Sequence, residues 1–263
     1  MINTVRTPAV AGTFYPADAH ELHNMVKNFL QQVDVSNQTV PKALIAPHAG
    51  YIYSGAVAAS VYAQLAPARE IIEKVVLLGP SHRVPLTGLA ATGMTHFATP
   101  LGQIPIDQQA LEKVLSLPQV SILDQAHAYE HSLEVQLPFL QEVLKHFNLI
   151  PLVVGETTPI QVSEVLEILW GGEETLIVIS SDLSHYHDYD TAQKIDQLTS
   201  KAIENLRFEE IHYEQACGRN PINGLLHVAR TRGLHAQTVD LRNSGDTAGP
   251  RHQVVGYGTY VFN

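Results

Sequence analysis

The clearest pattern along the chain is a short, mainly apolar run that ends at polar residues, and it occurs three times. The runs cover residues 43–46, 75–79 and 175–180. Short apolar runs bounded by turn residues are typical of buried strands. A His or an Asp follows each run within a few residues, namely His48, His82, Asp182 and His185.

Segments with apolar residues at helical spacing lie between and after these strands. Helices are predicted to begin near Asp18, which can cap the first turn, and to cover residues 159–170. Residues 235–241 and 253–262 have the pattern of two further strands, joined by a loop as in an antiparallel pair. The chain is therefore predicted to be a single α/β domain over residues 1–263, with a mixed, mainly parallel central sheet and helices on both faces.

This predicted sheet brings together the polar residues that follow its strands. The carboxyl ends of neighbouring parallel strands form the edge where open α/β sheets bind their ligands. If the three runs are neighbours, we expect His48, His82, Asp182 and His185 to gather at that edge. This expected cluster is the strongest functional signal in the sequence.

Composition narrows the classes of function. The 263 residues carry a net charge of −10 with only 16 Lys and Arg, so the basic stripe of a nucleic-acid-binding surface is missing. No apolar run approaches the ~20 residues of a membrane-spanning helix, and residues 1–10 lack the apolar core of a signal peptide. We therefore expect a cytoplasmic protein with neither a nucleic-acid partner nor a membrane partner. The 14 His residues are, in contrast, a large stock of metal ligands and proton carriers.

The residues at the predicted edge allow several kinds of chemistry. His48 and His82 are candidate metal ligands because strand ends hold imidazoles rigidly, although each could simply cap its strand. Asp182 and His185 would be further ligands or an acid–base pair beside a metal, and Asp182 is also a good cap for the following turn. Cys217 precedes a predicted helix whose N-terminus favours the thiolate, which ligates metals or acts as a nucleophile. A buried structural Cys is the remaining alternative.

Four more residues are expected to line a ligand-binding pocket at the same edge. They flank the polar strand ends or lie in the polar segment 124–131. These candidate substrate-binding residues are Tyr51, His127, His131 and Tyr186.

Taken together, the motifs resemble those of the Memo family. The match spans essentially the whole chain, and the combination of motifs is specific. The matching phrases are Ala46-Pro47-His48-Ala49-Gly50-Tyr51, Gly79-Pro80-Ser81-His82, Glu130-His131-Ser132-Leu133-Glu134, Ser180-Ser181-Asp182-Leu183-Ser184-His185 and Cys217-Gly218-Arg219. The family is similar in fold to class III extradiol dioxygenases, which are non-haem Fe(II) enzymes. The resemblance therefore implies an α/β domain with a metal pocket.

The resemblance also implies roles for individual residues. His48, His82 and Cys217 fall on the metal-ligand positions. Asp182 and His185 fall on pocket positions beside the metal, where they are the candidate catalytic residues. The implied cofactor is a metal ion, iron in the first place, with copper and zinc as alternatives. A Cys stands where the dioxygenases have a carboxylate, and a thiolate changes the redox behaviour of a metal site.

Functions from different classes are compatible with these residues. The first is a redox-capable iron or copper enzyme in a dioxygenase-like pocket. The second is a non-catalytic metal-binding or peptide-binding module that retains the pocket, and the third is a zinc or Cys/His hydrolase. The expected ligand is a small molecule or a peptide. In microbes the family is coupled with a radical-SAM protein, which is the implied partner.

Overall fold

The computed structural model describes residues 4–35 and 39–263, so the prediction about residues 1–10 falls partly outside the described residues. Nine strands form the main sheet, in the order β10-β12-β2-β9-β3-β8-β4-β7 with β11 paired to β12. Their bounds are β2 (Ala43–Ala46), β3 (Lys74–Pro80), β4 (Leu89–Ala91), β7 (Val120–Ile122), β8 (Asn148–Val154), β9 (Thr175–Ser180), β10 (His185–His187), β11 (Ala236–Asn243) and β12 (Val254–Phe262). A three-stranded sheet beside it contains β1 (Val5–Arg6), β5 (His96–Thr99) and β6 (Gly102–Pro105).

The centre of the main sheet is parallel. β9 lies between β2 and β3 and runs parallel to both, and β8 runs parallel to β3. The strands on either side reverse direction, since β12 is antiparallel to β2 and β4 is antiparallel to β8. The predicted mixed α/β sheet is confirmed, with its parallel part at the centre, and the two C-terminal strands form the expected antiparallel pair. The three predicted strands that are followed by a His or an Asp are direct neighbours, so their carboxyl ends share one edge.

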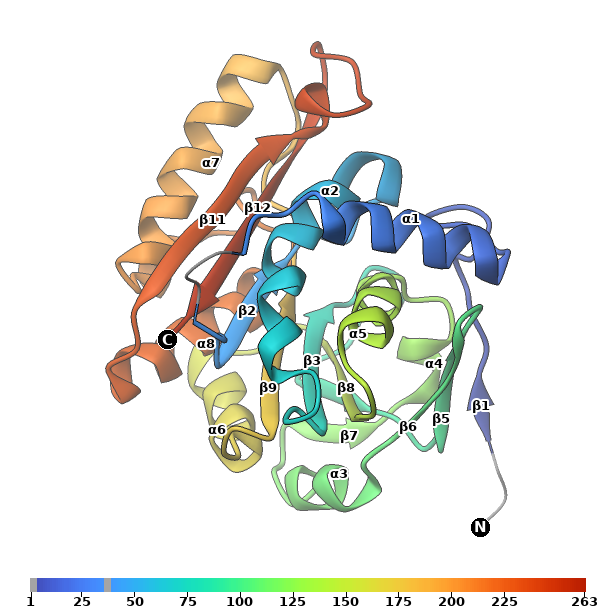
Figure 1. Cartoon of the computed structure of the whole chain (residues 1–263). Coiled ribbons are helices and arrows are strands. Elements are labelled where there is room, and N and C mark those ends of the chain that lie inside the picture. Colours follow the sequence, from blue (N-terminus) through green and yellow to red (C-terminus); the bar gives the residue numbers. More distant parts are fainter. Residues whose placement is uncertain (1–3, 36–38) are drawn as a thin grey trace.

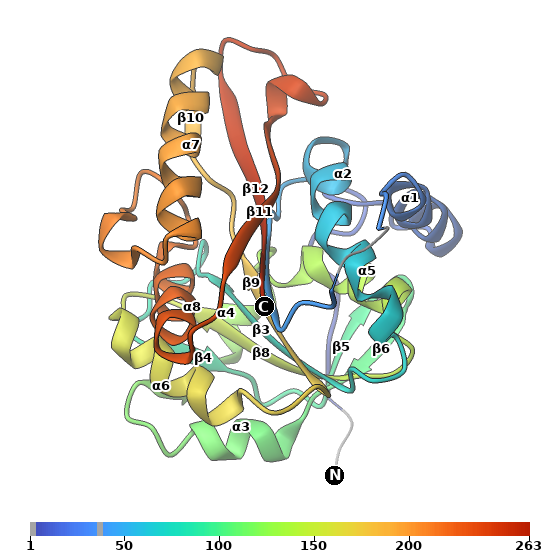
Figure 2. The same ribbon diagram turned by 60° about the vertical axis from the view of Figure 1, so that its left-hand side comes forward.

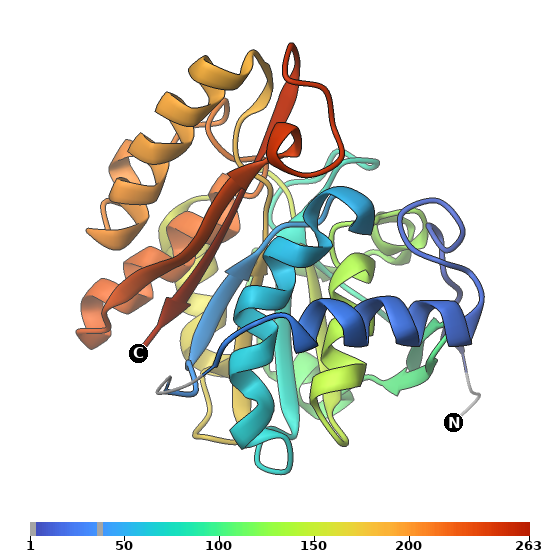
Figure 3. The same ribbon diagram turned by 45° about the horizontal axis from the view of Figure 1, so that its top comes forward.

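Helices cover both faces of this sheet, as predicted (Figures 1 and 2). One face carries α1 (Ala19–Gln31), α2 (Tyr51–Tyr62) and α5 (Leu137–Val143), and the other carries α3 (Gln108–Val114), α6 (Pro159–Leu169) and α8 (Arg219–Arg232). α7 (Tyr189–Glu204) packs on the β11–β12 pair, away from the N-terminal part of the chain (Figure 3). The remaining short helices are α4 (Asp124–Ala128), η1 (Ala63–Ala68), η2 (Glu134–Gln136), η3 (Phe208–Glu210) and η4 (Ser244–Asp246).

Local sequence explains where two of these helices begin. The Asp18 carboxylate accepts the backbone N–H groups of His20 and Glu21, both at 2.9 Å, and so caps α1. Pro138 lies in the first turn of α5, where the N–H that proline lacks would have no helical partner. Pro138 is therefore accommodated at the beginning of α5 without breaking the helix.

No helix within residues 4–35 and 39–263 combines the length and the apolar character that are needed to cross a membrane.

Candidate metal centre

Three histidines meet at the carboxyl edge of the parallel strands. His48 follows β2, His82 follows β3, and His131 lies in the turn that follows α4. The ring centroids are 5.2 Å apart for His48 and His82, 5.4 Å for His48 and His131, and 4.6 Å for His82 and His131. Each ring offers one nitrogen, and the three nitrogens lie within 4.8 Å of one another. This spacing fits a metal ion held between imidazoles.

His48 is buried and held on both sides of its ring. Its backbone N–H donates to Asp182 Oδ1 at 2.8 Å, its Nδ1 lies 2.8 Å from Ser180 Oγ, and its Nε2 lies 3.4 Å from Cys217 Sγ. Burial, followed by the nearby His131 and His82 rings, lowers the pKa of His48 well below its ordinary value. The ring is therefore neutral at pH 7, which is the form that binds a metal.

The Glu130 carboxylate anchors His82. It is 1% exposed and accepts the His82 backbone N–H at 2.6 Å, and His82 Nδ1 lies 2.8 Å from its Oε1. Burial alone would raise the pKa of Glu130, but the hydrogen bonds and charge of His82 and the Ser132 N–H outweigh it and lower the pKa to about 2. Glu130 is thus a carboxylate at neutral pH.

His131 belongs to the same cluster, although the sequence placed it among the substrate-binding residues. Its ring packs against Phe14 with centroids 4.8 Å apart. Burial lowers the pKa of His131 to about 4, despite the opposing charge of Glu130. Its Nδ1 lies 3.3 Å from Glu130 Oε1 but has no hydrogen-bond partner in the described structure. The sequence predicted His131 at the same edge but not as a possible ligand, because the turn after α4 has no periodic pattern that pairs it with the two strand-end histidines.

Cys217 lies beside His48, as expected, and its surroundings decide the protonation of its thiol. Besides the contact with His48, Sγ lies 3.6 Å from Asp182 O. Burial, followed by the charge of Asp182, raises the pKa of Cys217 to about 12. Burial therefore outweighs the N-terminus of α8, and the thiol is favoured over the thiolate in the metal-free chain.

Asp182 and His185 line the same cavity as the histidines. Burial raises the pKa of Asp182, and the charge of His185 and the His48 N–H oppose this shift only in part. His185 begins β10, and its Nδ1 donates to Leu183 O at 2.8 Å. Since the Leu183 carbonyl can only accept, Nε2 is the His185 nitrogen left to exchange a proton with a ligand.

The cavity has a volume of about 700 Å³. Tyr186 lies on its wall, is 70% exposed and has a backbone φ of 63°, a left-handed conformation that is uncommon outside glycine. The sequence analysis did not single out four of the other lining residues, which are Phe14, His187, Tyr213 and Glu214. The full lining is Phe14, His48, His82, His131, Asp182, His185, Tyr186, His187, Tyr213, Glu214 and Cys217.

Two residues that were expected in the pocket lie in the packed interior instead. Tyr51 is 1% exposed, and its hydroxyl donates to Val135 O at 2.7 Å. His127 is buried with Nε2 2.9 Å from Ala90 O and its ring against Phe97. Neither is among the residues that line the cavity.

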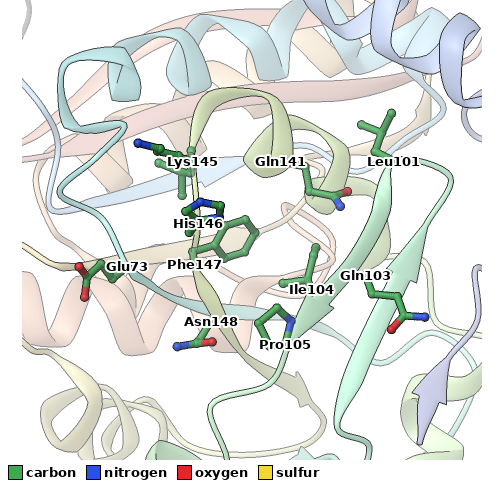
Figure 4. A pocket seen from close by; sticks show the side chains of 11 residues that line it. Glu73, Leu101, Gln103, Ile104, Pro105, Gln141, Lys145, His146, Phe147 and Asn148 are labelled. Carbon is green, nitrogen blue, oxygen red and sulfur yellow. The ribbon is translucent and has the colours of Figure 1, made fainter. Parts of the chain in front are cut away.

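A second hollow lies at the opposite end of the parallel strands, where β3 and β8 begin (Figure 4). Its volume is about 450 Å³, and its wall includes Lys145, His146 and Asn148. It contains none of the predicted site residues. The candidate chemistry therefore belongs to the carboxyl edge.

Comparisons with known proteins agree with this fold. A family model described as Memo-like protein matches residues 6–261. A MEMO1 family protein of Aquifex aeolicus is 41% identical over 280 residues, covering 98% of this chain and 99% of its own. A MEMO1 family protein of Ignicoccus hospitalis is 36% identical, covering 98% of both chains.

One solved structure is similar in fold alone. It is the crystal structure of an uncharacterized protein from Escherichia coli K12, with a TM-score of 0.56 and 13% identity, covering 83% of this chain and 98% of that one. The likeness to extradiol dioxygenases stays a prediction. The family model and the relatives extend over nearly the full length, and the chain belongs to the Memo family.

Proposed function

We propose that this protein binds a transition-metal ion at the carboxyl edge and that the site is redox-capable, with iron as the first candidate and copper as the second. The observation that carries the proposal is the convergence of the His48, His82 and His131 nitrogens within 4.8 Å. His48 and His82 are the proposed common ligands. His131 and Cys217 are the proposed additional donors, because one completes the histidine cluster and the other lies 3.4 Å from His48 Nε2.

The donor set supports a borderline or soft metal. Imidazoles and a thiol suit Fe(II), copper and Zn(II) better than they suit Mg²⁺ or Ca²⁺. Bound iron or copper would supply one-electron redox chemistry to a ligand in the cavity. The neutral state of His48 leaves it ready to ligate, and a nearby cation would favour the thiolate of Cys217.

The cavity also contains groups that can move protons. Asp182 is buried with a raised pKa, so it takes up a proton more readily than an exposed Asp. His185 presents its free Nε2 to a bound ligand. We propose that this pair gives protons to, or takes protons from, a ligand in the cavity.

The hydrolase alternatives receive less support. A Cys nucleophile needs a thiolate, whereas burial raises the pKa of Cys217 to about 12. A zinc hydrolase would use the same donors, so the choice between a zinc hydrolase and a redox site depends on which metal the protein prefers.

The test uses the metal-free protein loaded with Fe(II) without oxygen, after which O₂ is admitted and its uptake followed. We expect uptake above that of free Fe(II), lost in His82→Ala and kept in His146→Ala, a matched control in the opposite hollow (Figure 4). Preference for Zn(II) without oxygen uptake would favour the hydrolase. Metal binding without any catalysis would favour a binding module.

The same preparation separates the two additional donors. Metal affinity is measured for His131→Ala and for Cys217→Ala by competition with a chelator. The variant with the larger loss identifies the stronger ligand, and unchanged affinity in both would leave only two protein ligands and refute this donor set.

A further inference from the structure

The hydrogen bonds around Glu130 determine which nitrogen of His82 carries the proton. Three backbone N–H groups, which can only donate, point at this carboxylate: those of His82, His131 and Ser132. A carboxylate that accepts these groups also accepts from His82 Nδ1, which lies 2.8 Å from Oε1. The proton that His82 directs at Glu130 is therefore on Nδ1, and Nε2 keeps its lone pair whenever the ring is neutral, which is the form that binds a metal.

Ser180 determines the protonation of His48 by a different route. Its hydroxyl donates its one proton to Ser132 O at 2.5 Å. Its oxygen then accepts from Gln136 Nε2 at 2.8 Å and faces His48 Nδ1 at 2.8 Å. Because the hydroxyl proton is already used, His48 Nδ1 must be the donor. The lone pair of His48 is therefore also on Nε2, the atom that lies 3.4 Å from Cys217 Sγ.

Ser132 joins the two networks into one. Its N–H donates to Glu130, its carbonyl accepts from Ser180, and its hydroxyl donates to Pro80 O at 2.8 Å. Glu130, Ser132 and Ser180 are all buried, so water does not compete for these bonds. His131 differs, because its Nδ1 has no hydrogen-bond partner among the described residues.

We propose that Glu130 and Ser180 are positioning residues that hold His82 and His48 in the Nδ1-protonated tautomer before any metal arrives, leaving both Nε2 atoms as the ligating atoms. The tautomer part stands on the hydrogen bonds alone, and the part about ligation rests on the proposed metal site. Partners of the second ring nitrogen fix the orientation of a metal-binding His and increase its basicity. The two rings thus need no tautomer change to bind.

The tautomers are measured directly by long-range ¹H–¹⁵N NMR of the metal-free full chain with labelled histidines. We expect the proton on Nδ1 in both rings. In Ser180→Ala, His48 should become a mixture of tautomers while His82 is unchanged. Ser60→Ala is the matched control, because it removes another buried hydroxyl, bonded to Val57 O, and should change neither ring.

The second measurement is the affinity for Zn(II). It is made on Ser180→Ala and on Glu130→Gln, which keeps one acceptor oxygen but removes the charge. We expect these two variants to bind Zn(II) about 10–100-fold more weakly than the wild type and Ser60→Ala to bind normally. An Nε2 proton on either ring of the wild type would overturn the proposal. So would Ser180→Ala with an unchanged His48 tautomer and unchanged affinity. A wild type in which both rings are Nδ1-protonated but which binds no metal would support the tautomer assignment and refute the proposed function.

Discussion

Replacing Glu134 by Gln is expected to destabilise the fold strongly without touching the cavity. Glu134 is 0% exposed, and its carboxylate pairs with the guanidinium of Arg6. It also accepts the N–H groups of Ala9 at 2.8 Å and Val10 at 3.0 Å and the hydroxyl of Tyr15 at 2.5 Å. One carboxylate thus fastens the N-terminal segment to the rest of the chain.

The size of the effect follows from the charge that the substitution leaves behind. Arg6 is only 5% exposed, and its other bonds go to the carbonyls of His127 and Glu130, which carry no compensating charge. Breaking a buried ion pair by removing one partner costs about 3–5 kcal/mol. The amide of Gln also turns a donor toward groups that need an acceptor, which adds to the loss. We expect the free energy of unfolding to fall by at least about 3 kcal/mol.

Urea unfolding measures this loss, with Glu156→Gln as the matched control. Glu156 also pairs with an Arg, Arg219 at 3.4 Å, but its side chain is 74% exposed, so its loss should stay below about 1 kcal/mol. The double variant Arg6→Met with Glu134→Gln should lose less than the sum of the two single changes, since no buried charge remains unpaired. A loss below about 1 kcal/mol for Glu134→Gln would refute the reasoning.

Three further predictions concern residues outside the ligand set. Burial raises the pKa of Asp196 to about 6, so the folded state binds its proton more tightly than the unfolded state and wild-type stability falls as the pH rises from about 4 to above 6. Asp196→Asn keeps the acceptor for Ser184 N–H and should be more stable than the wild type by about 2–3 kcal/mol at pH 8. This difference should disappear below pH 4. Urea unfolding at several pH values measures it. Gly256→Ala would place a methyl group 2.0 Å from Asp196 Oδ2, and calorimetry should show a loss of about 1–3 kcal/mol; an unchanged melting temperature would contradict the contact. Tyr186→Gly relieves a φ of 63° and should gain up to about 1 kcal/mol, whereas Tyr186→Ala should not.

The sequence predicted the parts of the site that depend on strand order. His48 and His82 follow apolar runs, and parallel pairing of β2, β9 and β3 brings the ends of those runs together. Family motifs predicted that Cys217 lies near them. The radical-SAM partner and the identity of the metal stay predictions.

The sequence could not predict features that depend on rotation about a helix or on burial. Tyr51 follows His48 closely but begins α2, whose orientation turns the ring into the core. The pKa of Cys217 depends on how deeply the thiol is enclosed, which neighbouring residues in sequence do not determine. The His131 backbone N–H donates to Glu130, which holds the turn that brings His131 to the cluster. The sequence does not show that this Glu is buried.

The separation of the site residues along the chain has a consequence for folding kinetics. Cys217 and His48 touch although 169 positions separate them, and His82 and His131 come from two other segments. Contacts between distant segments form only after most of the chain has collapsed around the sheet, because closing long loops costs entropy first. A metal held by these residues should therefore slow unfolding and leave the refolding rate unchanged, which stopped-flow fluorescence with and without Zn(II) can measure. Faster refolding with metal would mean that the site assembles before the sheet.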